Sequence, residues 1–293
     1  MPSVRAQSSG KPRARYAFET MSNQPATPPP AVPLVTLTTD FGTRDPYVAA
    51  MKGVLLDRCP QLRLVDLSHE IGPQDVLEAA IFLAGALPTF PAGSVHLAVV
   101  DPGVGSERRA IAVRTGGQTV VCPDNGLLTL FAREHPIEAA HEITNPAFIR
   151  ADVSATFHGR DLFAPAAARL ACGAPLSEAG PAIEGGIVTI DVPEARRDGD
   201  EIRGEVLRID RFGNAITNVT LTLLDRGIIA EVRAGEARLR ALHRTYADVA
   251  LGEPLALFES NGYLAIAVNG GDAGATLDLA RGTAVTVTIG GAG

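Results

Sequence analysis

Apolar and polar positions follow one pattern in the first 175 residues of this chain and a different pattern after residue 200. In the first part, apolar runs of about six residues alternate with segments in which apolar residues recur at helical spacing. This alternation predicts strands buried on both faces and helices that cover them, that is, an α/β N-terminal domain at 34–175 with a mostly parallel sheet and helices on both faces. The predicted strands are 34–39, 62–67, 95–100, 110–114, 119–122 and 141–144, and the predicted helices are 75–87, 127–134, one beginning at Pro46 and one ending near Ala171.

After residue 200 the pattern changes to short β-rich runs separated by turn residues, without a strong helical signal. Residues 176–200, between the two parts, carry proline, glycine and charge clusters and predict a linker. We therefore expect a C-terminal domain at 201–293 that is all-β, as a small antiparallel barrel or sandwich. Its predicted strands are 201–209, 215–219, 227–234, 237–242, 254–258, 263–268 and 284–289.

The first 33 residues differ in kind, being rich in proline, serine, arginine and alanine without an apolar core segment. This composition predicts a disordered tail. The tail also has no apolar stretch of the kind that a secretory signal contains, and Met21 is a candidate for the native start. We leave it out of the fold prediction.

Composition and charge narrow the class of protein. Hydrophobic residues make up 46% of the chain, but no apolar run approaches the roughly 20 residues that span a bilayer, so a membrane partner is not expected. The net charge of −7 disfavours nucleic acid as the main partner and is compatible with a cationic small ligand. Cys59, Cys122 and Cys172 are far apart and in apolar surroundings, so we expect core thiols of a cytoplasmic protein.

The first strand leads directly to Asp40, where the chain turns before a helix. Ligands of open α/β sheets bind beyond the carboxyl ends of strands, so Asp40 is a candidate to hold a ligand's hydroxyl groups or a metal. A turn aspartate that bonds its own backbone is the equally plausible alternative at this point. Asp45 is expected to be the N-cap of the following helix, with Pro46 in its first position.

Two more segments of the first domain, 101–109 and 157–161, place titratable residues beside glycine. Neither ends in the pattern of a phosphate-binding loop, and no Gly-x-Gly-x-x-Gly fingerprint is present, so cofactor folds of those types are not expected. Carboxylates and a histidine at strand ends also permit a metal-dependent nucleotidase or phosphatase. The ligands of that alternative would be Asp40, Asp101, Asp124, His158 and Asp161.

Taken together, the motifs resemble those of the S-adenosyl-L-methionine (SAM) hydroxide adenosyltransferases, or SAM hydrolases, which are related to the fluorinases and chlorinases. The resemblance runs from about residue 34 to the C-terminus. It rests on motifs in a fixed order: TDFGTRDPYVAAMKG, VDPGVGSERRAIAVR, PDNGLL, FHGRDLFAPAAA with IDRFGNAITN, and SNGYLAIAVNGG. It implies an α/β domain followed by a β-barrel domain, no cofactor and no metal. It also implies a homotrimer, with each site between the first domain of one subunit and the second domain of its neighbour.

The resemblance also implies a role for each matching residue. Asp40 would hold the ribose hydroxyl groups, and Asp45 and Asp210 the methionine ammonium. Asp101, Arg108 and His158 would orient and activate a water molecule, with His158 or Asp101 taking its proton. The remaining matches are Ser260, Asn261 and Tyr263 around the methionine carboxylate, and Phe212, Asn214, Val268 and Asn269 around the adenine.

The implied activity is hydrolysis of SAM to adenosine and L-methionine by in-line attack of water on C5′. A halogenase is less favoured, because the Asp101 carboxylate would repel a halide at short range. A non-catalytic SAM or adenosine sensor would not need the Asp101, Arg108 and His158 set. One departure from the family pattern concerns the binding of the methionine carboxylate. Asn261 stands where the halogenating relatives carry a basic residue, and Arg44 lies beside Asp45.

Overall fold

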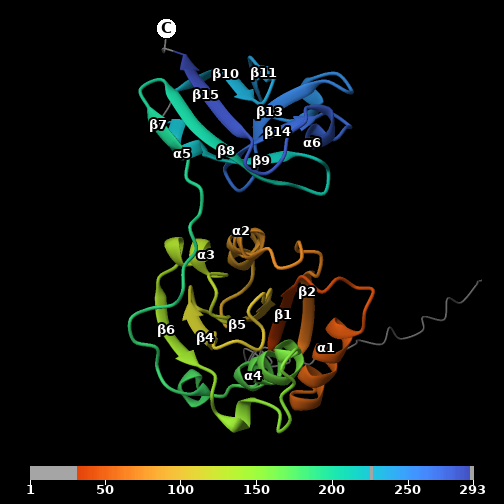
Figure 1. Cartoon of the computed structure of the whole chain (residues 1–293), viewed down its shortest axis with the longest axis vertical. Coiled ribbons are helices and arrows are strands. Elements are labelled where there is room, and N and C mark those ends of the chain that lie inside the picture. Colours follow the sequence, from red (N-terminus) through yellow and green to blue (C-terminus); the bar gives the residue numbers. More distant parts are fainter. Residues whose placement is uncertain (1–31, 225–226, 291–293) are drawn as a thin grey trace, which may run out of the picture. The chain divides into compact units, whose positions relative to one another are not determined.

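The computed structural model describes residues 32–224 and 227–290 (Figure 1). The tail predicted for residues 1–33, including Met21, lies outside the described residues except for its last two positions. Within the described ranges, no helix has both the length and the apolar character needed to cross a bilayer.

The N-terminal region is built on one six-stranded mixed sheet with the strand order β2-β1-β3-β5-β4-β6. The pairs β1–β2, β1–β3 and β3–β5 are parallel, whereas β4 is antiparallel to both β5 and β6. The parallel half therefore agrees with the sequence prediction, and the other edge is antiparallel. The strands are β1 (Leu34–Thr39), β2 (Arg63–Ser68), β3 (Val95–Val99), β4 (Ala110–Thr115), β5 (Gln118–Pro123) and β6 (Ile137–Glu142).

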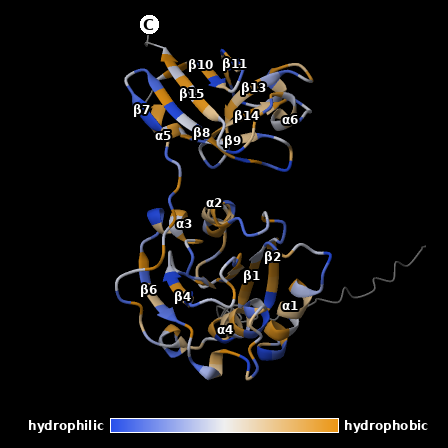
Figure 2. Ribbon diagram, in the orientation of Figure 1, coloured by the Kyte–Doolittle hydropathy of each residue, from blue (hydrophilic) through white to orange (hydrophobic). Residues whose placement is uncertain are grey.

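Helices cover both faces of this sheet, as Figure 1 shows. One apolar core joins the sheet to α1 (Tyr47–Arg58) and α4 (Ala164–Ala171). A second core lies on the other face, under α2 (Val76–Ala86) and α3 (Thr129–Glu134). The central strands are buried on both faces because each face is covered, and Figure 2 shows hydrophobic positions along both the sheet and the helices that cover it.

The start of α1 differs from the prediction. The residue that precedes the helix is Pro46, which has ψ near 6° and makes no side-chain cap, and Asp45 is exposed one residue further out. The Asp45 carboxylate is therefore not the N-cap. The expected pattern is present instead at α2, where the side chain of Asp75 accepts the backbone N–H of Glu78 at 2.9 Å.

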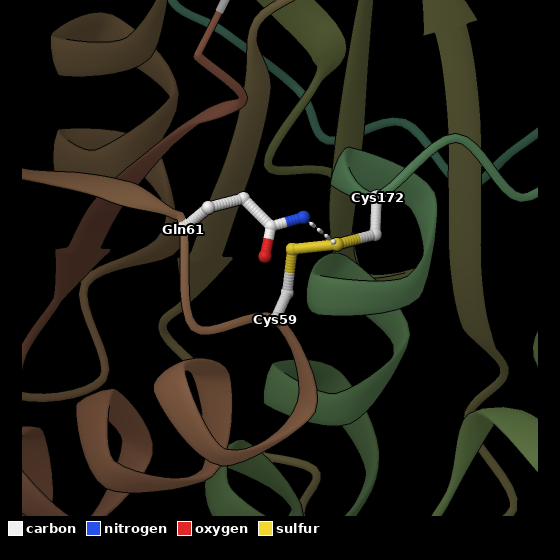
Figure 3. The surroundings of a disulfide bond; sticks show 3 residues. All are labelled: Cys59, Gln61 and Cys172. Carbon is white, nitrogen blue, oxygen red and sulfur yellow. Dashed lines mark hydrogen bonds between the residues drawn. A yellow bond between two sulfur atoms is a disulfide. The ribbon is translucent and has the colours of Figure 1, made fainter.

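The expectation of three core thiols is wrong for two of them. Cys59, which follows α1, and Cys172, which follows α4, form a disulfide (Figure 3). The Gln61 amide donates to the Cys172 sulfur at 3.2 Å. Only Cys122 matches the prediction, because it is a free thiol buried in the sheet, where burial raises its pKa. The cysteines therefore no longer support the prediction of a cytoplasmic protein.

The C-terminal region is rich in strands, which bury one large apolar core and one smaller apolar cluster. Its strand order is β11-β10-β15-β8-β9-β14-β13-β12, with β7 paired to β8. Two one-turn helices, α5 (Leu221–Leu224) and α6 (Ala273–Thr276), accompany the sheet. The strands are β7 (Arg196–Asp198), β8 (Glu201–Ile209), β9 (Ala215–Thr220), β10 (Ile228–Ala234), β11 (Ala237–Leu239), β12 (Leu242–His243), β13 (Pro254–Phe258), β14 (Tyr263–Val268) and β15 (Ala284–Gly290).

The segment predicted as a linker, 176–200, contains ordered pieces at both ends. Leu176 and Ala179 are buried in the core that α1 and α4 share with the sheet. At the other end, β7 pairs with β8 in antiparallel register.

Candidate functional site

Asp101, Arg108 and His158 come together at the carboxyl end of β3, as their motifs predict. Arg108 Nε donates to Asp101 Oδ1 at 2.9 Å and to Oδ2 at 3.1 Å, and Arg108 Nη2 donates to Oδ2 at 2.5 Å. The same Nη2 lies 2.7 Å from Nδ1 of His158. One guanidinium therefore holds a carboxylate and an imidazole in a fixed relation.

The cluster is shielded from solvent. The side chains of Arg108 and Asp101 are only 10% and 5% exposed, and the guanidinium lies 5.1 Å from the centroid of the Phe163 ring. Burial of the imidazole, followed by the nearby charge of Arg108, lowers the pKa of His158. A guanidinium only donates hydrogen bonds, so His158 Nδ1 is the acceptor, and a neutral His158 carries its proton on Nε2.

His158 owes its position to the π-helical turn η3 (Gly159–Phe163), which it immediately precedes. Asp161 in this turn is fully buried, receives two hydrogen bonds from Arg160, and accepts the backbone N–H of Ser154 at 3.0 Å. A side chain at Gly159 would lie 3.1 Å from the sulfur of Met51 and 3.3 Å from the Phe41 ring. Glycine is therefore what allows this turn to pack closely beside His158.

Asp40 follows β1 directly and is half-buried. Its Oδ2 accepts the backbone N–H of Gln74 at 2.8 Å, so the alternative of an aspartate bonded within its own turn does not describe it. The neighbouring Gly42 donates its N–H to the carbonyl oxygen of His69 at 2.7 Å, which fixes the loop from a second side. Asp45 is exposed nearby in the sequence, outside α1.

The C-terminal region has a pocket of about 550 Å³ that unites three of the predicted adenine residues. Phe212 contributes a ring that is 78% exposed, and Asn214 and Val268 line the pocket with it. Asp210 organises this turn, because its Oδ1 accepts the N–H groups of Phe212 and Asn214 at 2.8 Å each. Its Oδ2 accepts the Asn214 side-chain amide at 2.9 Å.

Tyr246 also lines this pocket, although it belongs to none of the sequence motifs. It begins the short 3-10 helix η5 (Tyr246–Asp248), and its hydroxyl accepts the Asn214 amide at 3.3 Å. Burial, followed by the charges of Glu259 and Asp210, raises the pKa of Tyr246, so the hydroxyl is neutral at pH 7. The only available signal was an aromatic residue between polar turn residues, which carries little information.

Asn269 does not join the pocket. Its side-chain amide donates to the carbonyl of Val249 at 2.9 Å, and its backbone N–H donates to the carbonyl of Glu253 at 3.0 Å. Asn269 therefore secures the 249–253 loop. The lining residues beyond Val268 are Gly270 and Gly271 instead.

The three residues predicted around a carboxylate lie at the turn from β13 to β14. Ser260 lines a second, smaller cavity of about 280 Å³ together with Arg244 and Tyr246. Asn261 uses its side-chain oxygen to accept the N–H of Tyr263 at 3.2 Å. The 280 Å³ cavity thus places a cation, Arg244, beside Ser260, although Asn261 itself is not basic.

Three of the four carboxylates of the alternative metal site are already engaged by arginine, and Asp101 is held by Arg108 as described above. Asp124 is buried and accepts two hydrogen bonds, one from Arg109 Nε at 2.8 Å and one from the backbone N–H of Val188 at 2.8 Å. Asp161 is held by Arg160, as described above. Within residues 32–224 and 227–290, no group of three or more histidine, cysteine or acidic side chains is arranged to hold a metal ion.

Comparison with known proteins covers almost the whole described chain. A family profile described as "SAM hydroxide adenosyltransferase N-terminal domain" matches residues 35–180, and one described as "SAM hydroxide adenosyltransferase C-terminal domain" matches 204–286. A crystal structure of an uncharacterized conserved protein from Thermotoga maritima aligns with a TM-score of 0.82 at 35% identity, over 87% of this chain and 99% of that one.

Named relatives are similar over the same length. The (R)-S-adenosyl-L-methionine hydrolase of Salinispora tropica is 46% identical, with 88% of this chain and 98% of that protein covered. The protein of that name from Thermus thermophilus is also 46% identical, with 86% and 98% covered. A fluorinase from Actinoplanes sp. is 31% identical, with 87% and 97% covered.

Proposed function

The chain belongs to the SAM hydroxide adenosyltransferase family, and on that premise we propose that it hydrolyses (R)-S-adenosyl-L-methionine to adenosine and L-methionine. The observation that carries the proposal is the buried Asp101–Arg108 pair joined to the partly buried His158. The names of the 46% identical relatives support both the substrate and its (R) form.

The reaction requires little of the protein beyond positioning the water nucleophile. Water attacks C5′, the C–O bond forms, and the C–S bond breaks. The bonding pair returns to sulfur, so the sulfonium becomes a neutral thioether and needs no acid to leave. Catalysis then rests on holding one water in line on the face opposite sulfur, in a poorly hydrated site.

Hydrogen-bond capacity favours Asp101 over His158 as the acceptor of the water's proton. Asp101 Oδ1 accepts one hydrogen bond from Arg108, and a carboxylate oxygen has about two lone-pair sites. The single lone pair of His158 Nδ1 is already directed at Arg108. We therefore assign proton acceptance to Asp101 and orientation of the water to His158 through its Nε2–H.

Substrate recognition is divided between the two regions of the chain. We assign the ribose hydroxyl groups to Asp40 and the adenine to the 550 Å³ pocket with Phe212, Asn214 and Val268. Tyr246 joins this set as an additional wall. We assign recognition of the methionine part of SAM to Asp45, Asp210, Ser260, Asn261 and Tyr263. Arg244 is a candidate cation for the methionine carboxylate.

The direct test is to incubate the purified protein with SAM and to follow adenosine and methionine by chromatography. Adenosine should form without added metal, and ¹⁸O-water should label its 5′-hydroxyl. Loss of activity with EDTA that a divalent ion restores would support the metal-dependent alternative instead. Binding of SAM without any adenosine over hours would support the sensor.

We further propose a homotrimer in the cytoplasm, with a closed C-terminal barrel and each site shared by two subunits. Mixing two inactive variants tests the shared site. If Arg108 and Asn214 of one site come from different subunits, mixed oligomers of Arg108→Met and Asn214→Ala chains regain about a quarter of the sites. Sites contained in single chains would regain none, and the mass of the particle in solution gives the number of subunits.

A further inference from the structure

The turn between β2 and α2 has an unusual residue at its third position. Asp75 donates its N–H to the carbonyl of Gly72 at 2.9 Å, which closes a four-residue turn with Pro73 second and Gln74 third. Gln74 has a φ of 65°. Proline followed by a residue of positive φ is the pattern of a type II turn, in which glycine is favoured at the third position. Gln74 therefore adopts a backbone conformation that side chains disfavour.

The first turn of α2 enforces this conformation. The Glu78 carboxylate accepts the N–H of Gly72 at 2.9 Å, and the Glu78 N–H is in turn capped by Asp75 at 2.9 Å. A Cβ at Gly72 would lie 2.9 Å from Glu78 Oε2, so any other residue here would push aside the carboxylate that accepts the Gly72 N–H. Strain of this kind persists where the surroundings determine it, and it often accompanies function.

The consequence of the conformation is the direction of one N–H group. The backbone N–H of Gln74 donates to Asp40 Oδ2 at 2.8 Å, and within the described residues this is the one hydrogen bond that the Asp40 side chain accepts. Hydrogen bonds to an ionised carboxylate are stronger than neutral ones. Oδ1, and the second lone pair of Oδ2, keep their capacity to accept further donors.

We propose that Gln74 is a positioning residue whose backbone N–H fixes the Asp40 carboxylate for the two hydroxyl groups of the ribose. This inference rests on the ribose role proposed for Asp40. A carboxylate held at one oxygen loses little further rotational freedom when it binds a vicinal diol, so the hydrogen bond contributes to substrate selection. The glutamine side chain is not required for this role, whereas the N–H and the positive φ are.

The experiment deletes the N–H and measures preference for the diol. Incorporation of the α-hydroxy analogue of glutamine at position 74 replaces the N–H by an ester oxygen. Gln74→Pro also removes the donor and excludes a positive φ. Gln74→Ala and Gln74→Gly retain the N–H and serve as controls. An ester at Glu70, whose N–H donates to the Ser68 hydroxyl, is the matched control for the ester chemistry.

Each protein is compared with SAM and with its 2′,3′-dideoxy analogue as substrates, and kcat and KM are determined for both. We expect the ester at position 74 to raise KM for SAM about ten- to a hundred-fold, to leave KM for the analogue unchanged, and to change kcat little. The Ala and Gly variants should keep the preference for SAM. The ester variant carries the conclusion should Gln74→Pro fail to fold.

Equal loss for both substrates, or an unchanged preference in the ester variant, would overturn the inference and leave the proposed function intact. A wild-type protein that hydrolyses SAM and its dideoxy analogue equally well, to adenosine and dideoxyadenosine respectively, would remove the ribose role of Asp40, and this inference with it. Failure of the wild-type protein to release any adenosine would refute the proposed function itself.

Discussion

Replacing Arg108 by methionine tests the most strongly buried charge pair of the site. Asp101 and Arg108 are 5% and 10% exposed, so solvent screening does not reduce their interaction to the level of a surface pair. The substitution leaves the Asp101 carboxylate buried without its partner, which typically costs about 3–5 kcal/mol. Part of that cost is the contact of the guanidinium with the Phe163 ring, about 1 kcal/mol.

The assay is urea unfolding followed by far-ultraviolet circular dichroism at pH 7, analysed by linear extrapolation. We expect Arg108→Met to lower the free energy of unfolding by about 3–5 kcal/mol. Adding Asp101→Asn should return a large part of that loss, because the double variant buries no unpaired charge. Both variants should lose about 10²–10⁴-fold in kcat.

A loss of less than about 1 kcal/mol for Arg108→Met would mean that the pair behaves as a solvent-exposed one. A double variant no more stable than the single variant would show that the cost comes from lost packing rather than from the unpaired carboxylate. Either result would refute the reasoning.

Three further predictions concern other residues. His158→Ala should lower kcat far more than it raises KM for SAM, and equal changes in both would reduce His158 to a residue that shapes the pocket. Burial lowers the pKa of His96 to about 4, so the folded state favours the neutral ring. The free energy of unfolding should therefore be highest above pH 6.5, and it should fall by about 3 kcal/mol as the pH drops to 4 and below. His96→Gln should flatten this dependence in urea titrations, and an unchanged slope would assign it to other groups. Reduction of the Cys59–Cys172 disulfide should lower the free energy of unfolding by about 4–5 kcal/mol, because the disulfide closes a loop with a sequence separation of 113. The stability of the Cys59→Ser/Cys172→Ser variant should not respond to dithiothreitol, whereas Cys122→Ser should respond like the wild type.

The alternation of apolar runs and helical spacing was enough to predict the α/β region because each element buries its own face locally. The direction of β4 was not predictable in this way, since a strand buried on both faces has the same apolar pattern in parallel and antiparallel pairing. Likewise, Cys59 and Cys172 become neighbours only because α1 and α4 end side by side. Nothing local to either cysteine indicates its partner.

For the candidate site, the motifs predicted which residues gather at the end of β3 but not how they share hydrogen bonds. Asn269 follows Val268 directly but does not line the pocket, because successive side chains of an extended chain point in opposite directions. Tyr246 was missed because it reaches the pocket from the three-residue 3-10 helix η5, which is too short to show a periodic pattern. Gln74 was missed because its contribution is a backbone N–H, which every residue except proline has.

The π-helical turn at Gly159–Phe163 makes the site sensitive to the length of this segment as well as to its composition. Its closing hydrogen bond runs from the N–H of Ala164 to the carbonyl of Gly159, one residue wider than in an α-helix. Deleting a single residue here would convert the turn to α-helical geometry and leave α4 in place. His158 would then rotate by about 100° around the helix axis, away from Arg108. A one-residue deletion could therefore abolish catalysis in a relative that retains every residue of the Asp101, Arg108 and His158 cluster.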